Sequence, residues 1–341
     1  MVKENTFFKS TVRLTIGKPM KAMLCFVCLL FVTLLYVHSC DTATFYALRG
    51  PNSALRVAID EQTRSALAPF QDLSQHDCPL LVQNEKRYQL AVGARESQVK
   101  TLDDLWVMLR KTAEAWDCGD LSGTDYSNGG DPKWICGFAT IKNRPCVVYS
   151  FGSNGNIAFE EGIRSRHSMC SVDTFDPTMN AQYHFRGHYS YVGANELPDA
   201  MNFHQVGLGG FDGMVTGHTG AKPFEMYVAT LSTIMSKLKH HYLDVLKIDI
   251  EGSEWGFLDN FFDQWPVGSS VTVGNLLLEV HLSQKLAFGR KINDVVRVQT
   301  ELEARGYRLV HVAVIPGNLD MAELSYTHKN YARDEKPHPG C

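Results

Sequence analysis

The stretch that most constrains the fold is residues 244–255, Asp-Val-Leu-Lys-Ile-Asp-Ile-Glu-Gly-Ser-Glu-Trp. It begins as a short apolar run bounded by polar residues, which is typical of a strand buried on both faces. The chain then turns at Gly252 and enters a predicted helix over residues 253–264, with apolar residues spaced along one face and Ser253 as the N-cap. A strand that passes through a tight turn into a helix indicates an α/β fold.

Two carboxylates, Asp249 and Glu251, lie where this strand ends. The next predicted strand, residues 273–281, also ends in polar residues, among them His281. Ligands of open α/β sheets bind at the carboxyl ends of the strands, so we take Asp249, Glu251 and His281 as candidate site residues. The alternative is structural: the two acids cap a turn and face water, and His281 fills an ordinary place at a strand end.

A second strand–turn–helix unit lies over residues 146–164. A predicted strand over 146–151 runs into Gly-Ser-Asn-Gly-Asn at 152–156, and a predicted helix follows over 157–164. Glycines such as Gly152 and Gly155 let the backbone approach a ligand closely, and the helix N-terminus offers free N–H donors. The turn is neither a G-x-G-x-x-G motif nor a P-loop, and glycine is common in tight turns, so the turn alone indicates little.

The following strand, predicted over residues 169–174, leads into Asp-Thr-Phe-Asp-Pro at 173–177. An acid at this place can accept hydrogen bonds from both ribose hydroxyls of a nucleoside ligand. Asp176 is our first candidate and Asp173 our second, and in the alternative reading either of them caps the turn. A Gly-rich turn followed by an acid about twenty residues later is typical of a site for an adenosine-containing cofactor.

The rest of the chain divides into segments of several kinds. Residues 41–100 show no clear periodicity, a helix with a capping box is predicted over 101–116, and residues 118–142 are predicted to form a Gly-rich loop. Further strands are predicted over 202–209, 307–314 and 322–328, and further helices over 230–239 and 292–305. Residues 211–223 are expected to be a Gly-rich excursion that forms part of a substrate lid.

Residues 1–40 combine a basic segment with an apolar one. Residues 1–21 are rich in Lys and Arg, and residues 22–40 form an apolar run at the short end for a membrane span. The long basic segment and the lack of a clean cleavage site favour an uncleaved signal-anchor, hence a single-pass type II membrane protein of the secretory pathway. In the alternative reading a signal peptide is cleaved near Ser39 and the protein is secreted. We therefore divide the chain into a cytosolic tail (1–21), an anchor (22–40), a stem and helical region (41–116), a main domain (117–330) and a C-terminal tail (331–341).

The cysteines agree with an oxidising compartment. We predict at least one disulfide, with Cys118 to Cys136 as the first choice because it would close the Gly-rich loop. Cys146 and Cys170 fall at or near strands and are predicted to be buried thiols. A zinc site has little support, since no Cys-x-x-Cys lies outside the apolar run. The formal net charge of -4 gives no support to nucleic-acid binding, which typically requires a surface stripe of basic residues.

Two motifs together resemble a known family. Lys-Ile-Asp-Ile-Glu-Gly-Ser-Glu at 247–254, followed by Leu-Leu-Glu-Val-His at 277–281, is similar to the signature of FkbM-type S-adenosylmethionine-dependent methyltransferases. Val-Tyr-Ser-Phe-Gly-Ser-Asn-Gly at 148–155 and the N-terminal architecture look closest to the animal methyltransferase-like protein 24 group. The resemblance covers roughly residues 117–330. It implies a Rossmann-like class I methyltransferase sheet of about seven strands with the last strand antiparallel, beside the membrane anchor and stem.

The resemblance also implies roles for residues, with S-adenosylmethionine as the methyl donor. The cofactor contacts that it implies are Gly152, Asn154 and Gly155 in the turn and Asp176 as the ribose-binding acid, and Asp173 stays the second candidate from the residue pattern. The chain departs from the family pattern at two places. Ser150 stands where many such enzymes carry an acid before the first glycine, and Asn156 stands in place of a third glycine.

Methyl transfer from a sulfonium mainly requires that the reacting atoms are aligned. A hydroxyl acceptor also needs a base, or a metal that lowers its pKa. We expect Asp249 and His281 to assist deprotonation, and Glu251 to hold the substrate or share a divalent metal with them. Oxygen ligands plus one imidazole suit Mg²⁺ or Mn²⁺. The expected acceptor is a hydroxyl or carboxyl group on a glycan, a lipid or a small metabolite.

Two other functions fit parts of the pattern. A lumenal type II glycosyltransferase would share the anchor, stem and α/β domain, with Asp-Ile-Glu at 249–251 as its metal-binding acidic motif. A non-catalytic module could keep the methyltransferase fold and bind cofactor without turnover, because fold does not guarantee function.

Overall fold

The structure is a computed structural model that describes residues 79–93, 99–124, 133–138, 145–179, 201–219, 222–270, 272–282 and 289–331. The predicted cytosolic tail, the anchor, most of the stem and the C-terminal tail lie outside these ranges. Within the ranges described, no helix combines the length and the apolar character that a bilayer crossing requires.

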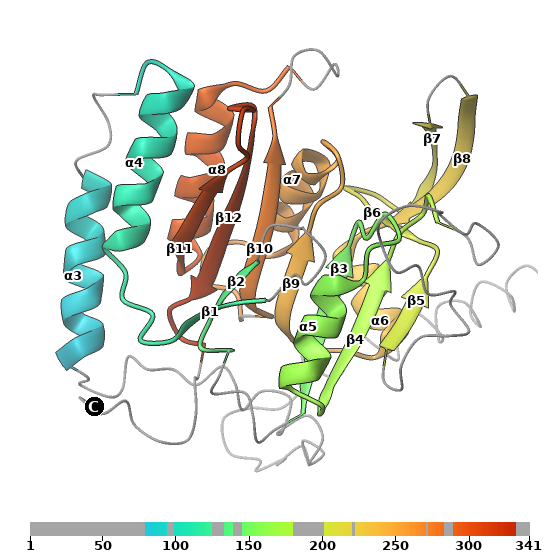
Figure 1. Ribbon diagram of the computed structural model, residues 1–341, viewed down its shortest axis with the longest axis horizontal. Helices are drawn as coiled ribbons and strands as arrows, with labels where there is room; N and C mark the ends of the chain where they lie inside the picture. Colours follow the sequence, from blue (N-terminus) through green and yellow to red (C-terminus); the bar gives the residue numbers. More distant parts are fainter. Residues whose placement is uncertain are drawn as a thin grey trace, which may run out of the picture. The chain divides into compact units, whose positions relative to one another are not determined.

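A seven-stranded sheet organises the described part of the chain, with the strand order β11-β12-β10-β9-β3-β4-β5 (Figure 1). Its strands are β3 (Cys146–Phe151), β4 (Cys170–Phe175), β5 (Met201–His204), β9 (Leu243–Ile248), β10 (Val273–His281), β11 (Tyr307–Val314) and β12 (Met321–His328). β12 runs antiparallel to both β10 and β11, whereas the pairs from β10 to β5 are parallel. The predicted seven strands with an antiparallel last strand are therefore confirmed.

Helices cover both faces of this sheet (Figure 1). α4 (Leu102–Glu114), α6 (Leu231–Leu238), α7 (Glu254–Gln264) and α8 (Ile292–Ala304) share one apolar core, and α5 (Ala158–Arg166) contributes to a second core. Successive side chains of a strand point to opposite faces, so on β3 Val148 belongs to the α5 core and Tyr149 to the other. The apolar runs of β3, β9 and β10 follow from this burial on both faces.

Two N-terminal helices complete the larger core. The capping box predicted for α4 is present: the Thr101 hydroxyl accepts from the Asp104 N–H and the Asp104 carboxylate accepts from the Thr101 N–H. A helix precedes it, α3 (Pro79–Gly93), where we predicted irregular structure. That prediction is wrong because apolar residues do not mark the packed face of α3: Leu90 is 76% exposed, whereas Tyr88 is buried and bonds Glu303 of α8.

Short strands occupy two segments that we predicted to be loops. β1 (Leu121–Gly123) pairs with β2 (Trp134–Cys136) inside the predicted Gly-rich loop. β7 (Gly213–Thr219) lies where we expected a Gly-rich excursion, over residues 211–223. It forms a three-stranded sheet with β8 (Lys222–Ala229) and with β6 (Gly207–Leu208), which lies at the end of the strand predicted over 202–209. Gly217 lets the side chains of Phe224 and Met226 pack over β7, since a Cβ on it would lie 2.8 Å from the ring of Phe224 and 2.9 Å from Met226.

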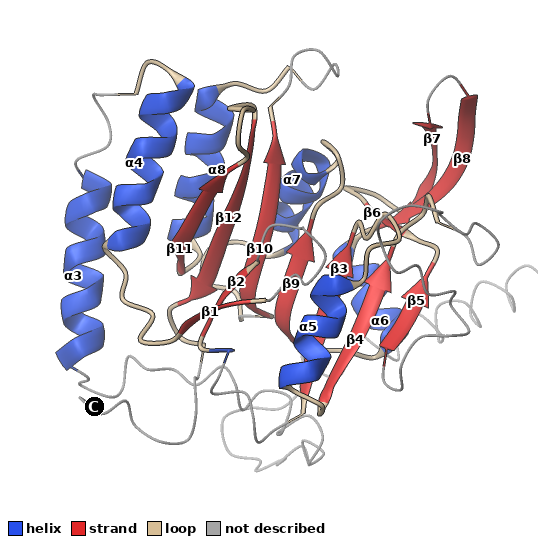
Figure 2. Ribbon diagram, in the orientation of Figure 1, coloured by secondary structure: helices blue, strands red, loops and turns tan. Residues whose placement is uncertain are grey.

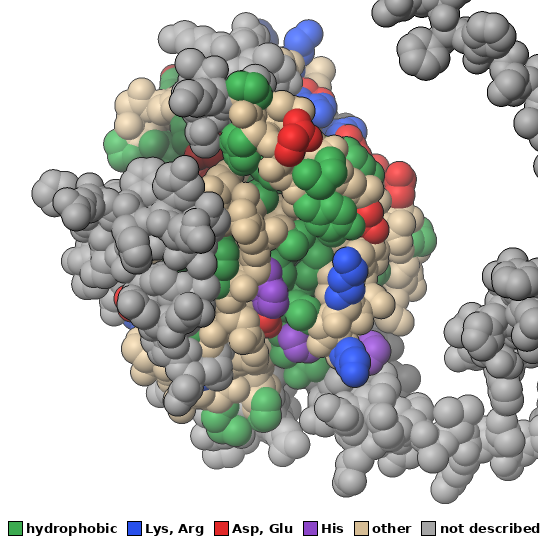
Figure 3. Space-filling model, turned by 90° about the vertical axis from the view of Figure 1, so that its right-hand side faces the viewer, with side chains coloured by type: hydrophobic (Ala, Val, Ile, Leu, Met, Phe, Trp, Pro, Cys, Tyr) green, Lys and Arg blue, Asp and Glu red, His purple; other side chains and the backbone are tan. Residues whose placement is uncertain are grey.

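The β7–β8 hairpin extends away from the main sheet (Figure 2). Met214 and Tyr227 are exposed apolar side chains of the hairpin, Phe211 is another just before β7, and the ammonium of Lys237 lies 5.6 Å from the ring centroid of Tyr227. Figure 3 shows the side of the molecule that carries this hairpin in Figure 1, with hydrophobic side chains gathered on it. The hairpin therefore adds an apolar surface beside the end of the sheet where β5 lies.

Two disulfides join the described cysteines. The predicted disulfide between Cys118 and Cys136 is present and ties β2 to the chain that follows α4. Cys146 and Cys170 also form a disulfide, so our prediction of buried thiols is wrong. The register pairs these two residues directly across β3 and β4, with their Cα atoms 4.3 Å apart, and this proximity depends on strand register rather than on any local pattern.

Candidate active site

The turn after β3 holds three residues in left-handed backbone conformations, Gly152, Asn154 and Gly155, with φ of 79°, 46° and 74°. Gly152 is required by packing, because a Cβ on it would overlap the carbonyl oxygen of Asp249. Lys247 strengthens the same junction, since its Nζ donates to the Gly152 carbonyl at 2.7 Å. The turn after β3 and the exit of β9 therefore lie directly against each other.

Asp176 follows β4 and contacts this turn. Its Oδ2 accepts from the Asn154 N–H at 2.7 Å, and its Oδ1 accepts from the N–H and the hydroxyl of Thr178 at 2.9 and 2.6 Å. The residue is 3% exposed. The structure thus brings the Gly-rich turn and its predicted acid together, and it shows that Asp176 fixes the shape of the turn. Contact of Asp176 with a ribose stays a prediction.

Asp173, the second candidate, lies inside β4 and faces β5. Its Oδ1 accepts from the Asn202 side-chain amide at 3.1 Å and lies 2.8 Å from Nε2 of His204. Burial, and then the charge of Asp173, raise the pKa of the Tyr149 hydroxyl on neighbouring β3. Because Asp173 contacts β5 and not the turn, Asp176 is the better placed of the two acids.

Asp249 and Glu251 lie in the turn between β9 and α7, beside His281 at the end of β10. One ligand atom from each of these three side chains lies within 4.8 Å of the other two. The side chains differ in exposure: 26% for Asp249, 77% for Glu251 and 2% for His281. The structure therefore brings together the three residues that we predicted from the ends of adjacent strands.

Glu254, the first residue of α7, connects these elements from a fully buried position. Its Oε1 accepts from the backbone N–H of His281 at 2.8 Å and lies 3.0 Å from Nδ1 of the same residue. Its Oε2 accepts from the Gly252 N–H at 2.7 Å. Ser253 takes the N-cap position of α7 as predicted, but its backbone is already helical, with φ -75° and ψ -12°, and its side chain makes no capping bond.

The imidazole of His281 is electrostatically coupled to the carboxylates around it. Burial by itself lowers the pKa of His281, but the hydrogen bond and charge of Glu254, with the charges of Glu251 and Glu279, outweigh burial and raise the pKa to about 9. Its Nε2 makes no hydrogen bond and lies 3.6 Å from a carboxylate oxygen of Glu251 and 3.6 Å from one of Glu279. The ring is therefore held on one side, with its second nitrogen directed at carboxylates.

A buried lysine that sequence reasoning missed completes the site. Lys133, next to β2, bonds Glu279 of β10 at 3.2 Å and also bonds Glu323 of β12. Burial lowers the pKa of Lys133 and raises that of Glu279. Glu279 was itself a usable signal, because a charged residue inside an apolar strand requires a buried partner. The identity of that partner was not predictable, since Lys133 lies 146 residues from Glu279 in the chain.

Ser150 stands at the place where the family resemblance led us to look for an acid. It is fully buried, and so is Glu160, in the first turn of α5. Burial raises the pKa of Glu160, an effect that Lys247 and Ser150 partly oppose. A carboxyl group is therefore present near this position, although it comes from the helix after the turn and not from the strand before it.

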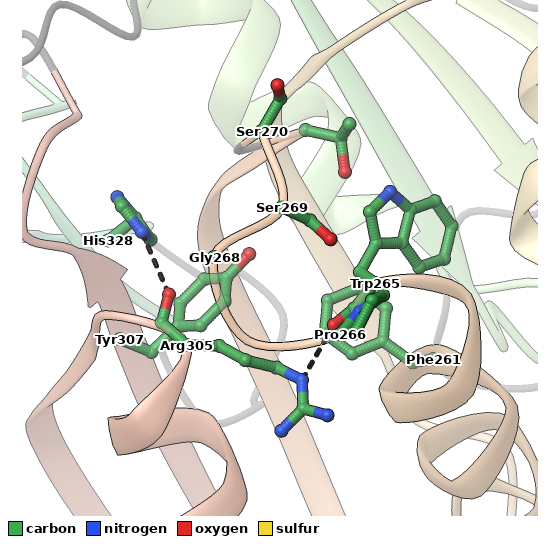
Figure 4. A pocket seen from close by; sticks show the side chains of 10 residues that line it. Phe261, Trp265, Pro266, Gly268, Ser269, Ser270, Arg305, Tyr307 and His328 are labelled. Atoms are coloured by element: carbon green, nitrogen blue, oxygen red, sulfur yellow. Dashed lines mark hydrogen bonds between the residues drawn. The ribbon is translucent and has the colours of Figure 1, made fainter.

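A separate small pocket lies at the other end of the sheet, between the end of α7 and the start of β11 (Figure 4). Arg305 donates to the Trp265 carbonyl at 2.8 Å, and Nε2 of His328 lies 3.0 Å from the Arg305 carbonyl. The Tyr307 hydroxyl donates to the Val273 carbonyl at 3.0 Å. Burial lowers the pKa of His328 to about 4, so this ring is neutral near pH 7. These polar groups are paired within the fold, and we assign the pocket a structural role.

The strand order, with β12 inserted antiparallel between β10 and β11, and the Gly-rich turn after β3 define a Rossmann-like methyltransferase fold. The chain belongs to the methyltransferase-domain family: residues 69–328 match the family model described as "Methyltransferase domain". This match supports a methyltransferase over the glycosyltransferase alternative. The narrower FkbM-type resemblance stays a prediction.

Curated relatives carry the name "Probable methyltransferase-like protein 24". The human protein is 24% identical over 176 residues, which are 50% of this chain and 43% of the human protein. The rat protein is 25% identical over 178 residues, which are 50% of this chain and 44% of the rat protein. The matched segment thus spans less than half the length of these relatives.

Solved methyltransferase-fold structures are similar at a lower level. A fibrillarin pre-rRNA processing protein of Methanococcus jannaschii is 12% identical with a TM-score of 0.32, covering 62% of this chain and 84% of that chain. The fibrillarin of Aeropyrum pernix, solved with natively bound S-adenosyl-L-methionine, is 8% identical with a TM-score of 0.29, covering 61% of this chain and 88% of that chain. Similarity at this level supports no argument about ligands, and the fold assignment rests on the strand order.

Proposed function

We propose that this protein is an S-adenosylmethionine-dependent methyltransferase that acts on a hydroxyl or carboxyl oxygen. One observation carries the proposal: the Asn154 N–H donates to Asp176 at 2.7 Å, which joins the turn after β3 to the acid after β4. Nucleoside cofactors of α/β sheets bind at this edge, outside the carboxyl ends of the strands. Asp249 and His281 lie at the same edge, at the ends of β9 and β10.

The residues of the turn fit the cofactor. Asn154 and Gly155 have positive φ, a turn geometry that favours glycine and allows close approach of the backbone, and the N-terminus of α5 follows directly. When bound, S-adenosylmethionine supplies a methyl group that its sulfonium already activates. The protein's residues then align the acceptor with that methyl group and remove the acceptor's proton.

We assign the role of general base to Asp249, whose side chain is 26% exposed at the end of β9. The acceptor oxygen forms the new bond to the methyl carbon, the sulfur keeps the electron pair of the broken S–CH₃ bond, and the acceptor's proton passes to Asp249. His281 holds the acceptor oxygen, and Glu251, which is 77% exposed, reaches the substrate from the outer side.

The proposed compartment is the secretory pathway, with the protein either anchored as a type II membrane protein or secreted after cleavage. The two disulfides support this proposal, because disulfides persist in oxidising compartments. The proposed acceptor is accordingly a glycan, a lipid or a small metabolite that reaches that compartment.

Titration of the purified protein with S-adenosylhomocysteine tests the cofactor assignment. We expect saturable binding to the wild type, no binding of nucleotide-sugars, and a loss of at least about tenfold in Asp176→Ala, because that change removes the hydrogen bonds that hold the turn. Glu114→Gln, an exposed change on α4, is the matched control. A folded wild type that does not bind S-adenosylhomocysteine would contradict the proposal.

Turnover separates an enzyme from a non-catalytic module of the same fold. We expect transfer of labelled methyl groups to at least one acceptor in extracts of secreted glycans and lipids, and its loss in Asp249→Asn. Tight cofactor binding with no transfer to any acceptor would favour the binding module.

A further inference from the structure

The side chains at the ends of β9 and β10 are arranged as metal ligands. One atom each from Asp249, Glu251 and His281 lies within 4.8 Å of the others. Ligands of an octahedral ion at about 2.1 Å lie about 3 Å apart in cis and about 4 Å apart in trans, so this spacing needs only small side-chain movements to close on one ion. Glu251 can make such a movement, because its side chain is 77% exposed.

Buried His281 gives independent support, since an acidic cluster alone would be an ordinary surface feature. Its side chain is 2% exposed, and its Nε2 makes no hydrogen bond although it points toward carboxylate oxygens of Glu251 and Glu279 at 3.6 Å. A buried polar atom without a hydrogen bond is costly, and the two carboxylates lie within ion-pair distance but beyond hydrogen-bond distance, so this nitrogen is open to a ligand bound between them.

Glu254 sets the ring in the orientation that a metal ligand needs. Its Oε1 lies 3.0 Å from Nδ1 and also accepts from the His281 backbone N–H at 2.8 Å, so Nδ1 carries the proton that this carboxylate accepts. With Nδ1 engaged by Glu254, Nε2 is the nitrogen that faces the carboxylate of Glu251. Carboxylate–histidine–metal arrangements use this second interaction to fix the tautomer and orientation of the ligand.

The charged side chains around the site are compatible with a bound cation. Lys133 is paired with Glu279 and Glu323, and the ammonium of Lys247 donates to the Gly152 carbonyl at 2.7 Å while lying 3.9 Å from Asp249. Lys247 is thus at the outer limit of an ion pair with Asp249, and the exposed carboxylate of Glu251 faces Nε2 of His281 at 3.6 Å.

We propose that Asp249, Glu251 and His281 bind one divalent cation of the Mn²⁺ or Mg²⁺ class, with Glu254 as the residue that positions the histidine. Two carboxylates and one imidazole suit such ions, and three protein ligands leave positions for water or an acceptor oxygen. The ion's role in lowering the pKa of an acceptor hydroxyl rests on the function proposed above. The binding site itself does not.

The test is direct binding of Mn²⁺ to the full-length protein after treatment with EDTA and dialysis. Loss of the free-ion electron paramagnetic resonance signal and calorimetry both report binding without any activity assay. We expect one site per chain, weakened at least about tenfold in Glu251→Gln and Asp249→Asn and unchanged in Glu114→Gln. Glu251 is exposed, so its variant keeps the fold, and thermal melting checks all the variants.

Glu254→Gln tests the positioning role, with an expected loss of about 10–100-fold in Mn²⁺ affinity. Absence of saturable Mn²⁺ binding, or equal affinity in Glu251→Gln, Asp249→Asn and the control, would overturn the metal site. Titration with S-adenosylhomocysteine in EDTA distinguishes the two proposals. Cofactor binding without Mn²⁺ binding would refute only the metal site, whereas Mn²⁺ binding without cofactor binding would refute only the proposed function.

Discussion

Replacing Lys133 by Met should make the free energy of unfolding depend on pH in a way that the buried cluster predicts. Met keeps much of the volume of the lysine stem and removes the charge. The change leaves Glu279 and Glu323 directly opposite each other in the β10–β12 register, at 8% and 7% exposure. Two buried carboxylates then share a site that has lost Lys133, the cation that contacts both of them.

The loss of stability in Lys133→Met can be worked out for two cases: both glutamates stay ionised, or one of them binds a proton. If both carboxylates stay ionised about 4 Å apart, their repulsion at an effective dielectric constant of about 20 is about 4 kcal/mol. If one glutamate binds a proton at pH 7, and its unfolded pKa is about 4.3, the cost is about 3.7 kcal/mol at 1.36 kcal/mol per unit. Either response destabilises Lys133→Met by about 4 kcal/mol at pH 7.

The pH dependence has a definite sign. A glutamate whose pKa is raised in the folded state adds no penalty below its unfolded pKa, and its penalty grows as the pH rises above that value. At pH 5 the cost of protonating one glutamate falls to about 1 kcal/mol. The destabilisation of Lys133→Met should therefore shrink by about 3 kcal/mol between pH 7 and pH 5.

Urea unfolding followed by circular dichroism at the two pH values measures both quantities. The matched variant is Lys133→Met with Glu279→Gln and Glu323→Gln, which removes the repelling charges and should recover most of the lost stability. The reasoning is refuted if Lys133→Met lies within about 0.5 kcal/mol of wild type at pH 7, or if its penalty is the same at pH 5.

Two further predictions concern other parts of the fold. Gly152→Ala should lower the free energy of unfolding by more than Gly268→Ala does. Both residues have positive φ, which costs alanine about 1–2 kcal/mol, but only the Cβ at Gly152 would overlap the Asp249 carbonyl. Equal losses of stability in urea unfolding would contradict this packing argument. His328, with a folded pKa of about 4 against about 6.5 unfolded, should give full stability above pH 6.5 and lose up to about 3 kcal/mol as the pH falls toward 4. His328→Gln should lack that part of the pH dependence, and an unchanged profile would show that the ring, although 3.0 Å from the Arg305 carbonyl, does not control acid stability.

The sheet was largely predictable because its strands carry local signals. β3 and β10 have the bounds predicted from apolar runs that end in polar residues, and the final antiparallel hairpin followed from two such runs. The convergence of Asp249, Glu251 and His281 also followed, since adjacent parallel strands end at the same edge. These inferences needed only sequence neighbours and a general rule of topology.

The features that could not be predicted depend on partners far away in the chain. α3 is held by the bond of Tyr88 to Glu303, 215 residues later, and its exposed leucine hides any amphipathic pattern. The disulfide between Cys146 and Cys170 depends on the register of two strands. Lys133 lies in a segment that we predicted to be a loop. Its pairing with Glu279 and Glu323 depends on the packing of β2 against β10 and β12, which no local pattern indicates.

The position of β12 has a consequence for how the protein is made. The strand lies between β10 and β11 although it is the last of the sheet to leave the ribosome. Until it arrives, the growing chain presents one side of β10 with unpaired amides and carbonyls, a surface that recruits strands from other molecules. A message that stops before residue 321 should therefore yield a product that aggregates or is degraded, and not a shorter working domain.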